Sequence, residues 1–285
     1  MRLFLTWLML ATLGSAAMEA AQLQLVTNAE PPAVFAGSNR LVNLCWRNTG
    51  DAVNETQIQS RMIQLTSATA VRIGEAPWKT LRVLPGQTVL ETAALDFPPV
   101  RAKTRFSVEW LDSGSNVLGA TEVFVYPTNL LAELGILLNH DENALGVYDP
   151  QNELKPLLQN LQIGFVDMGN TVAENFRGKL AIVGAFDSQR GAKSLVTSQI
   201  KMLATNGVAV VWVTPAKSEA MSDPEKTEPS FYLVPQNQTA TVVAQPRMLA
   251  APASNPRSQL NLIYFCKLAL RPSLAERTFS LPPNN

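Results

Sequence analysis

The sequence predicts a two-domain protein in which an all-β sandwich is followed by an α/β domain with a doubly wound sheet. Three observations support this prediction. The chain has 285 residues, which is enough for about two domains of ordinary size. Apolar and polar residues alternate in its first part, as in half-buried strands. Short apolar runs in its second part are separated by segments of helical periodicity. We place the domains at residues 22–127 and 128–285.

The composition excludes several classes of protein. Hydrophobic residues make up 46% of the chain and charged residues 16%, which excludes a disordered chain or a coiled coil. The 23 basic residues balance the 23 acidic ones, and no basic cluster suits a nucleic-acid partner. A single His and two distant Cys do not supply the spacing of a metal site. We therefore expect no metal, no cofactor and no nucleic acid.

Residues 1–17 have the pattern of a signal peptide. Arg2 provides the positive charge, Leu3 to Leu13 form a short apolar segment, and Ser15-Ala16-Ala17 provide small residues for cleavage after Ala17. The protein is therefore expected to be extracytoplasmic, either periplasmic or secreted. No stable transmembrane segment is expected after cleavage, and an uncleaved membrane anchor is the alternative.

The first domain is predicted from alternation and turn signals. Val42, Leu44 and Trp46 should point to one side of a strand, and the residues between them, including Cys45, to the other. Turn sequences recur at short spacing, as in Asn48-Thr-Gly-Asp51 and Pro85-Gly86. Strands and turns at this density predict two packed antiparallel sheets.

A resemblance accompanies this pattern. The segments Leu44-Cys-Trp-Arg-Asn-Thr-Gly-Asp51, Leu84-Pro-Gly-Gln87 and Glu122 to Tyr126 resemble the immunoglobulin-like sandwiches attached to bacterial cell-surface and secreted proteins. The resemblance implies that the two turns are structural and that Trp46 is the core aromatic residue.

The second domain is predicted from a change of period after Pro127. Helices are expected around Leu130–Leu138, behind a capping Asn152 and over Gly191–Asn206, the last ended by Gly207. Apolar runs predict buried strands at Ala144–Tyr148, Ile163–Val166, Leu180–Val183 and Val208–Val213. Alternating strands and helices predict an open doubly wound sheet of the flavodoxin-like type. A charged, proline-containing segment at 214–230 is expected to be a mobile surface loop.

Ligands of such sheets bind outside the carboxyl ends of the strands. The candidate ligand-binding residues there are Asp149, Asp167, Asn170, Asp187, Ser188 and Thr214. Helix capping and turn formation are the alternative roles for the same residue types. Because Arg190 is the only basic side chain expected nearby, a hydroxyl-rich or cationic ligand is favoured over a phosphate.

Residues 128–271 resemble class I glutamine amidotransferase-like domains, including non-catalytic forms attached to secreted glycosidases. The resemblance is carried by Gly178–Gly184, Ser194–Val213 and a terminal helix at Gln259–Leu270. Active members place a nucleophilic Cys on the turn after a central strand, but the corresponding Gly184-Ala-Phe-Asp-Ser188 has no Cys. His140 and Cys266 do not match the catalytic pair, so the resemblance implies a pseudoenzyme.

Two functions are compatible with these patterns. The first is a non-catalytic binding or scaffold protein of the bacterial cell envelope, with a partner protein or a carbohydrate as its ligand. The alternative is a glycoside hydrolase that uses two of Asp149, Asp167 and Asp187, or a glycosidase accessory subunit. A disulfide between Cys45 and Cys266 would have to join the two domains.

Overall fold

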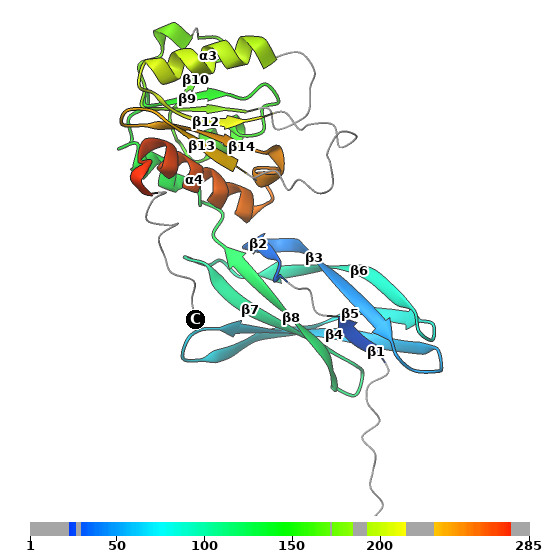
Figure 1. Cartoon of the computed structure of the whole chain (residues 1–285). Helices are drawn as coiled ribbons and strands as arrows, with labels where there is room; N and C mark the ends of the chain where they lie inside the picture. Colours follow the sequence, from blue (N-terminus) through cyan, green and yellow to red (C-terminus); the bar gives the residue numbers. More distant parts are fainter. Residues whose placement is uncertain (1–22, 27–29, 172, 185–192, 215–230, 275–285) are drawn as a thin grey trace, which may run out of the picture.

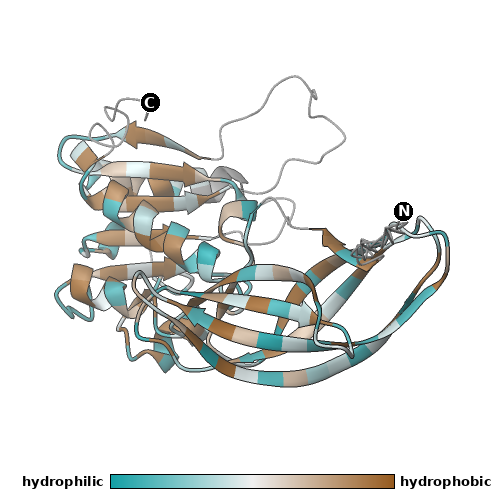
Figure 2. Ribbon diagram, turned by 90° about the horizontal axis from the view of Figure 1, so that it is seen from below, coloured by the Kyte–Doolittle hydropathy of each residue, from teal (hydrophilic) through white to brown (hydrophobic). Residues whose placement is uncertain are grey.

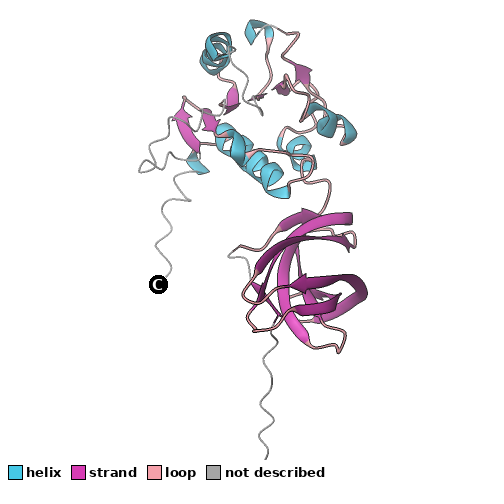
Figure 3. Cartoon of the chain, turned by 90° about the vertical axis from the view of Figure 1, so that its right-hand side faces the viewer, coloured by secondary structure: helices cyan, strands magenta, loops and turns pink. Residues whose placement is uncertain are grey.

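The computed structural model describes residues 23–26, 30–171, 173–184, 193–214 and 231–274. The predicted signal peptide, Asp187, Ser188, Arg190 and the segment 215–230 lie outside the described residues. We refer to residues 23–126 as the N-terminal region and to residues 127–274 as the C-terminal region. Every described helix belongs to the C-terminal region (Figure 3).

The N-terminal region consists of two sheets. One has the strand order β1-β3-β6 and the other β2-β8-β7-β4-β5 (Figure 1). The strands are β1 (Leu23–Val26), β2 (Ala33–Phe35), β3 (Gly37–Asn48), β4 (Asn54–Leu65), β5 (Ala70–Val83), β6 (Thr88–Phe97), β7 (Thr104–Leu111) and β8 (Val117–Tyr126). All described pairs are antiparallel except β2 with β8, which is parallel.

Inward side chains of both sheets form a single core. Val42, Leu44 and Trp46 are buried and Cys45 lies on the opposite side of β3, so the predicted alternation is confirmed. The ring of Trp46 stacks on Trp78 at 6.3 Å and meets Trp110 edge-on at 6.2 Å between centroids. Hydrophobic and hydrophilic residues alternate visibly along these strands (Figure 2).

The C-terminal region has one six-stranded sheet of order β10-β9-β11-β12-β14-β13. Its strands are β9 (Leu145–Tyr148), β10 (Val166–Asp167), β11 (Leu180–Val183), β12 (Ala209–Val213), β13 (Phe231–Pro235) and β14 (Ala240–Ala244). The described pairs are parallel except for the edge pair of β13 with β14. The predicted strands at Ala144–Tyr148, Leu180–Val183 and Val208–Val213 correspond to β9, β11 and β12. The strand predicted at Ile163–Val166 overlaps β10 only at Val166, and the sequence patterns do not predict β13 and β14.

Helices cover both faces of this sheet. The described helices are α1 (Ala132–Leu137), α2 (Lys155–Asn160), α3 (Lys193–Thr205), α4 (Pro256–Leu270) and the 3-10 helices η1 (Ala173–Asn175) and η3 (Pro246–Met248). Side chains of α1 and α4 share a core with one face of the sheet, and α3 and η1 pack on the other. Gly207 ends α3 in the left-handed region, with φ +77°, which confirms the predicted stop.

The predicted fold class, an immunoglobulin-like sandwich followed by a doubly wound flavodoxin-like domain, is wrong. Two of the three sheets mix parallel and antiparallel pairs. The connection from β10 to β11 contains the three-residue η1, where a doubly wound domain would carry a full crossover helix. Alternation identifies strands and their buried faces, but it is a local signal and does not specify which strands pair or in which direction.

The two predicted helices α1 and α2 are present, and each covers six residues. Helix α2 is bracketed by Asn152 and Gln162, and α1 is followed by Asn139 and His140, all with positive φ. Asn152 is therefore not the helix cap; the residue at that position is Leu154, without a side-chain cap. Among the described residues, no helix has both the length and the apolar character needed to cross a membrane.

The two regions meet at the beginning of α4. The guanidinium of Arg257 donates to the carbonyl oxygen of Pro31 at 2.6 Å and forms an ion pair with Glu30 at 2.6 Å. Glu30 and Pro31 lie in the short segment before β2, so α4 contacts both the C-terminal sheet and the N-terminal region.

Candidate functional site

The carboxyl ends of β9 and β10 bring three of the predicted residues together. Asp149 follows β9, Asp167 ends β10 and Asn170 lies in the turn after β10. The two strands are parallel neighbours, with Asp167 opposite Val147, so their carboxyl ends share one edge of the sheet. We call Asp149, Lys155, Asp167 and Asn170 the strand-end cluster.

Asp149 supports the first turn of α2. Its side chain is almost completely buried, and Oδ2 accepts the backbone N–H groups of Leu154 at 2.7 Å and Lys155 at 3.0 Å. These N–H groups have no partner within their own helix. Asp149 therefore caps the beginning of α2, which is the role that the sequence predicts for Asn152. Its other oxygen, Oδ1, is buried and finds no hydrogen-bond partner within the described part of the chain.

Asp167 is held as a carboxylate by two donors. Oδ2 accepts from the Lys155 ammonium at 2.8 Å, and Oδ1 accepts from the Gly169 N–H at 2.8 Å. The hydrogen bond from Lys155, followed by that from Gly169, holds the pKa of Asp167 below its usual value despite partial desolvation. Lys155 thus contacts Asp149 through its backbone and Asp167 through its side chain.

Lys155 had been missed by sequence reasoning, which expected Arg190 as the only basic neighbour. Asn170 is close to Asp167, with Nδ2 at 3.5 Å from Oδ2, and is exposed. Thr214 is separate: its N–H and hydroxyl both donate to the carbonyl oxygen of Ala244, at 3.0 and 3.2 Å, which extends the β12–β14 pairing. The described residues contain no group of three His, Cys, Asp or Glu side chains able to hold a metal ion.

The strand-end cluster is organised for structure more than for proton transfer. A general acid needs a raised pKa, and the pKa of Asp167 is lowered. Asp149 has one oxygen occupied by two backbone donors. The arrangement fastens α2 to the ends of β9 and β10.

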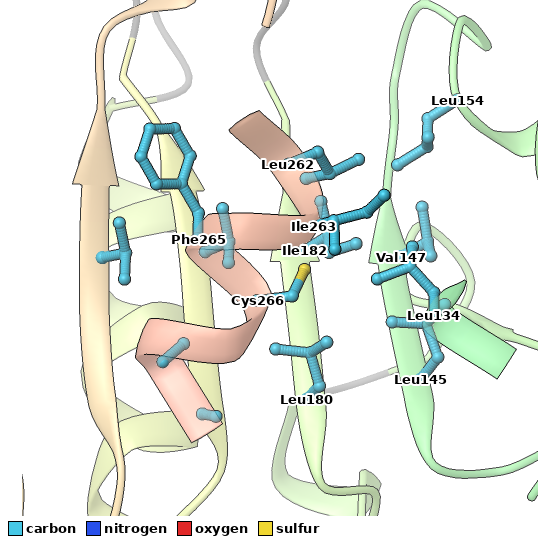
Figure 4. Close-up of a cluster of buried hydrophobic side chains, with 14 of the residues drawn as sticks. Leu134, Leu145, Val147, Leu154, Leu180, Ile182, Leu262, Ile263, Phe265 and Cys266 are labelled. Carbon is cyan, nitrogen blue, oxygen red and sulfur yellow. The ribbon is translucent and has the colours of Figure 1, made fainter. Parts of the chain in front are cut away.

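The two cysteines are free and have different environments. Cys266 is fully buried in α4, and its sulfur lies among Leu180, Ile182 and Ile263 (Figure 4). This burial raises the pKa of the Cys266 thiol, which keeps it protonated. His140 is exposed after α1, so an exposed imidazole and a core thiol do not form a catalytic pair.

The outer face of the three-stranded sheet carries exposed aliphatic side chains. Val26, Cys45 and Leu90 are directly opposite one another across β1, β3 and β6, and Leu41 is opposite Ala94. Leu90 is 81% exposed and Leu41 67%. Between the two rows, the Thr92 hydroxyl donates to Asn43 Oδ1 at 3.0 Å. We call Val26, Leu41, Cys45, Leu90 and Ala94 the outer apolar face. Of these positions, the alternation in the sequence predicts only the outward direction of Cys45.

Comparisons with known proteins identify no family. No protein-family model and no curated protein matches the sequence. Among solved structures, the DNA glycosylase AlkC of Pseudomonas fluorescens has a TM-score of 0.29 at 12% identity, over 37% of this chain and 31% of the other. A β-glucosidase of Listeria innocua has a TM-score of 0.27 at 18% identity, over 36% of this chain and 16% of the other. The sporulation control protein Spo0M of Bacillus subtilis has a TM-score of 0.27 at 12% identity, over 41% of this chain and 55% of the other.

The chain therefore spans well under two thirds of the length of each of these structures. The resemblance to an immunoglobulin-like module joined to an amidotransferase-like domain is contradicted by the strand topology, because two of the three sheets mix parallel and antiparallel pairs and the connection from β10 to β11 carries only the short η1. Short segments of alternating or apolar residues occur in many unrelated folds, so the quoted motifs did not specify a family.

Proposed function

We propose that this chain is a non-catalytic, extracytoplasmic binding protein of the cell envelope, and that it binds a partner protein through the outer apolar face. The exposure of Leu41 and Leu90 on one sheet face carries this proposal. Contiguous exposed apolar side chains mark interaction surfaces in folded proteins, whereas isolated ones need no explanation.

The chemistry of this face favours a protein over a carbohydrate. Sugars present many hydroxyl groups, and each needs a hydrogen-bond partner when it is buried. The outer apolar face is aliphatic, and the polar side chains between its two rows, Asn43 and Thr92, are bonded to each other. Aliphatic side chains of a partner protein would bury against it without leaving polar groups unpaired.

The non-catalytic part of the proposal is supported by the strand-end cluster. Asp149 and Asp167 are engaged by backbone N–H groups and by Lys155. The extracytoplasmic part is supported by the signal-peptide pattern of residues 1–17. The turnover assay below tests the non-catalytic part.

The test compares two matched double variants. The purified protein is used to isolate a partner from solubilised envelope, and that partner is then purified and titrated against each variant. Leu41→Ser with Leu90→Ser should weaken binding at least ~10-fold, because it removes the aliphatic contact area. Val71→Ser with Ile73→Ser removes exposed aliphatic groups from β5 and should leave binding unchanged.

Equal binding by both variants would overturn the assignment of the surface. Turnover of glycosides, esters or amides by the purified protein, lost in Asp149→Asn or Asp167→Asn, would overturn the non-catalytic assignment and favour the carboxylate-dependent hydrolase.

A further inference from the structure

Strand β6 is a long edge strand. It pairs with β3 on one side only, and no described strand lies beyond it in the three-stranded sheet. Figure 1 shows β6 at the margin of the N-terminal region. An edge strand presents unpaired backbone N–H and C=O groups, which can pair with another strand.

Other described edges carry features that discourage pairing. Strands β1, β2 and β10 are very short, and β13 ends in a proline. Strand β5 is long but contains Pro77 and four charged side chains, Arg72, Glu75, Lys79 and Arg82. Natural proteins protect their edges with short strands, prolines and charges of this kind.

Strand β6 has little of this protection. It contains no proline, and its register with β3 is regular from Leu95 to Thr88. Its outward positions from Thr88 to Ala94 are uncharged. The one charge within that stretch, Glu91, is paired with Lys79.

We propose that β6 pairs antiparallel with β6 of a second copy of this chain, with Thr92 opposite Thr92 at a twofold axis. This register aligns Thr88 to Asp96 with the same segment of the second copy. It puts Leu90 opposite Ala94 on the outer face and Glu91 opposite Ala93 on the inner face. No like charges are opposed, which suits a self-complementary interface.

Neighbouring registers that keep the two outer faces on the same side are less favourable. A register centred on Glu91 would oppose two carboxylates at the axis. One centred on Ala93 would put Leu90 opposite Asp96. One centred on Leu90 would pair only the first half of the strand, so the Thr92 register combines a long overlap with matched side chains.

The Thr92 register also joins the outer apolar faces. The row Val26–Cys45–Leu90 of one copy continues into Ala94 and Leu41 of the other, because Leu41 is opposite Ala94 within each sheet. The two three-stranded sheets then form one continuous sheet with a single, larger apolar face. The match between the rows of the two copies is the main argument for a second copy as the occupant of this edge.

A charge at the axis tests the proposal. In Thr92→Lys two ammonium groups would be directly opposed, and we expect the dimer dissociation constant to rise roughly 10-fold or more. Thr80→Lys introduces the same charge at an exposed position of β5 in the other sheet and should have no effect. Sedimentation velocity over a wide concentration range measures both. A wild-type protein that stays monomeric, or a dimer equally stable in Thr92→Lys, would overturn the proposal.

Crosslinking supplies an independent measurement if Thr92→Lys fails to fold. In a Cys45→Ser background, Thr92→Cys should give covalent dimers with a short thiol-specific crosslinker, because directly opposed Cβ atoms lie about 4.5–5.5 Å apart. Thr80→Cys in the same background should give none. Equal crosslinking of the two variants would contradict the register.

This inference goes beyond the proposed function, and the two fail separately. A protein that stays monomeric but binds a partner through Leu41 and Leu90 retains the proposed function and removes the self-association. If the protein forms the dimer but binds no envelope protein, the self-association is supported and the proposed function is wrong.

Discussion

The two regions differ in the side chains that they place at the edges and outer faces of their sheets. At the carboxyl ends of the C-terminal sheet, polar side chains form bonds within the chain, as Asp149 does with α2 and Asp167 with Lys155. On the three-stranded sheet, aliphatic side chains such as Leu90 face outward. Polar residues at strand ends have ready structural uses, whereas exposed aliphatic residues do not contribute to the core. The comparison therefore directs the search for a partner to the N-terminal region.

The largest expected difference concerns the two thiols. Native Cys45 should react with iodoacetamide roughly 1,000-fold or more faster than Cys266, because Cys266 needs an opening of the core. Mass spectrometry of timed, quenched samples measures both rates, and denatured protein provides the control in which both react. Comparable native rates would mean that the C-terminal core opens readily.

The second prediction compares inward and outward positions of the three-stranded sheet. Trp46→Ala removes a fully buried ring and should lower the free energy of unfolding by about 3–5 kcal/mol. Leu90→Ala, at an 81% exposed position, should change it by less than about 0.5 kcal/mol. Urea denaturation followed by tryptophan fluorescence or circular dichroism measures both. A large loss in Leu90→Ala would show that the outer face contributes to the fold itself.

The third prediction concerns the role of Asp149. Asp149→Ala removes the acceptor of two backbone N–H groups and should cost about 1–3 kcal/mol of unfolding free energy. Asp149→Asn keeps an acceptor oxygen and should cost less. Asn170→Ala, at an exposed position of the same cluster, is the matched control. If Asp149→Ala were as stable as wild type, the side chain would not support α2.

The smallest expected effect is the pH dependence contributed by Asp167. Its pKa is lowered in the folded state, so its stabilising contribution is present above the unfolded pKa and is lost as the pH falls through the folded pKa. The group is partly exposed, which limits the contribution to less than about 1 kcal/mol.

Asp167→Asn should therefore be slightly less stable than wild type at neutral pH, and the difference should vanish in acid. Paired urea titrations at several pH values measure it. A difference that persists in acid would assign the effect of Asp167 to packing and not to its charge.

Parts of the fold were accessible from local patterns. Alternation placed Val42, Leu44 and Trp46 in the core and turned Cys45 outward, and the apolar runs identified β9, β11 and β12. Gly207 ended α3 as predicted. These features depend on residues within a few positions of each other, which a sequence displays directly.

The candidate site was only partly accessible. The rule that polar residues gather at strand ends placed Asp149 and Asp167 together, but it did not identify Lys155 as their common partner. That contact joins residues 12 apart in sequence through the first turn of α2. The position of α2 depends on Asn152 and Gln162 adopting positive φ, which the apolar periodicity of the segment did not indicate.

The sequence by itself determined which residues face inward, where several strands and helices end, and the neutral charge that disfavours nucleic acid. The tertiary structure alone decided which strands pair, in which direction, and that β6 has a neighbour on one side only among the described strands. The physical reason is that side-chain alternation is set by the geometry of a single strand, whereas strand order depends on loop closure and on the burial of faces far apart in the chain.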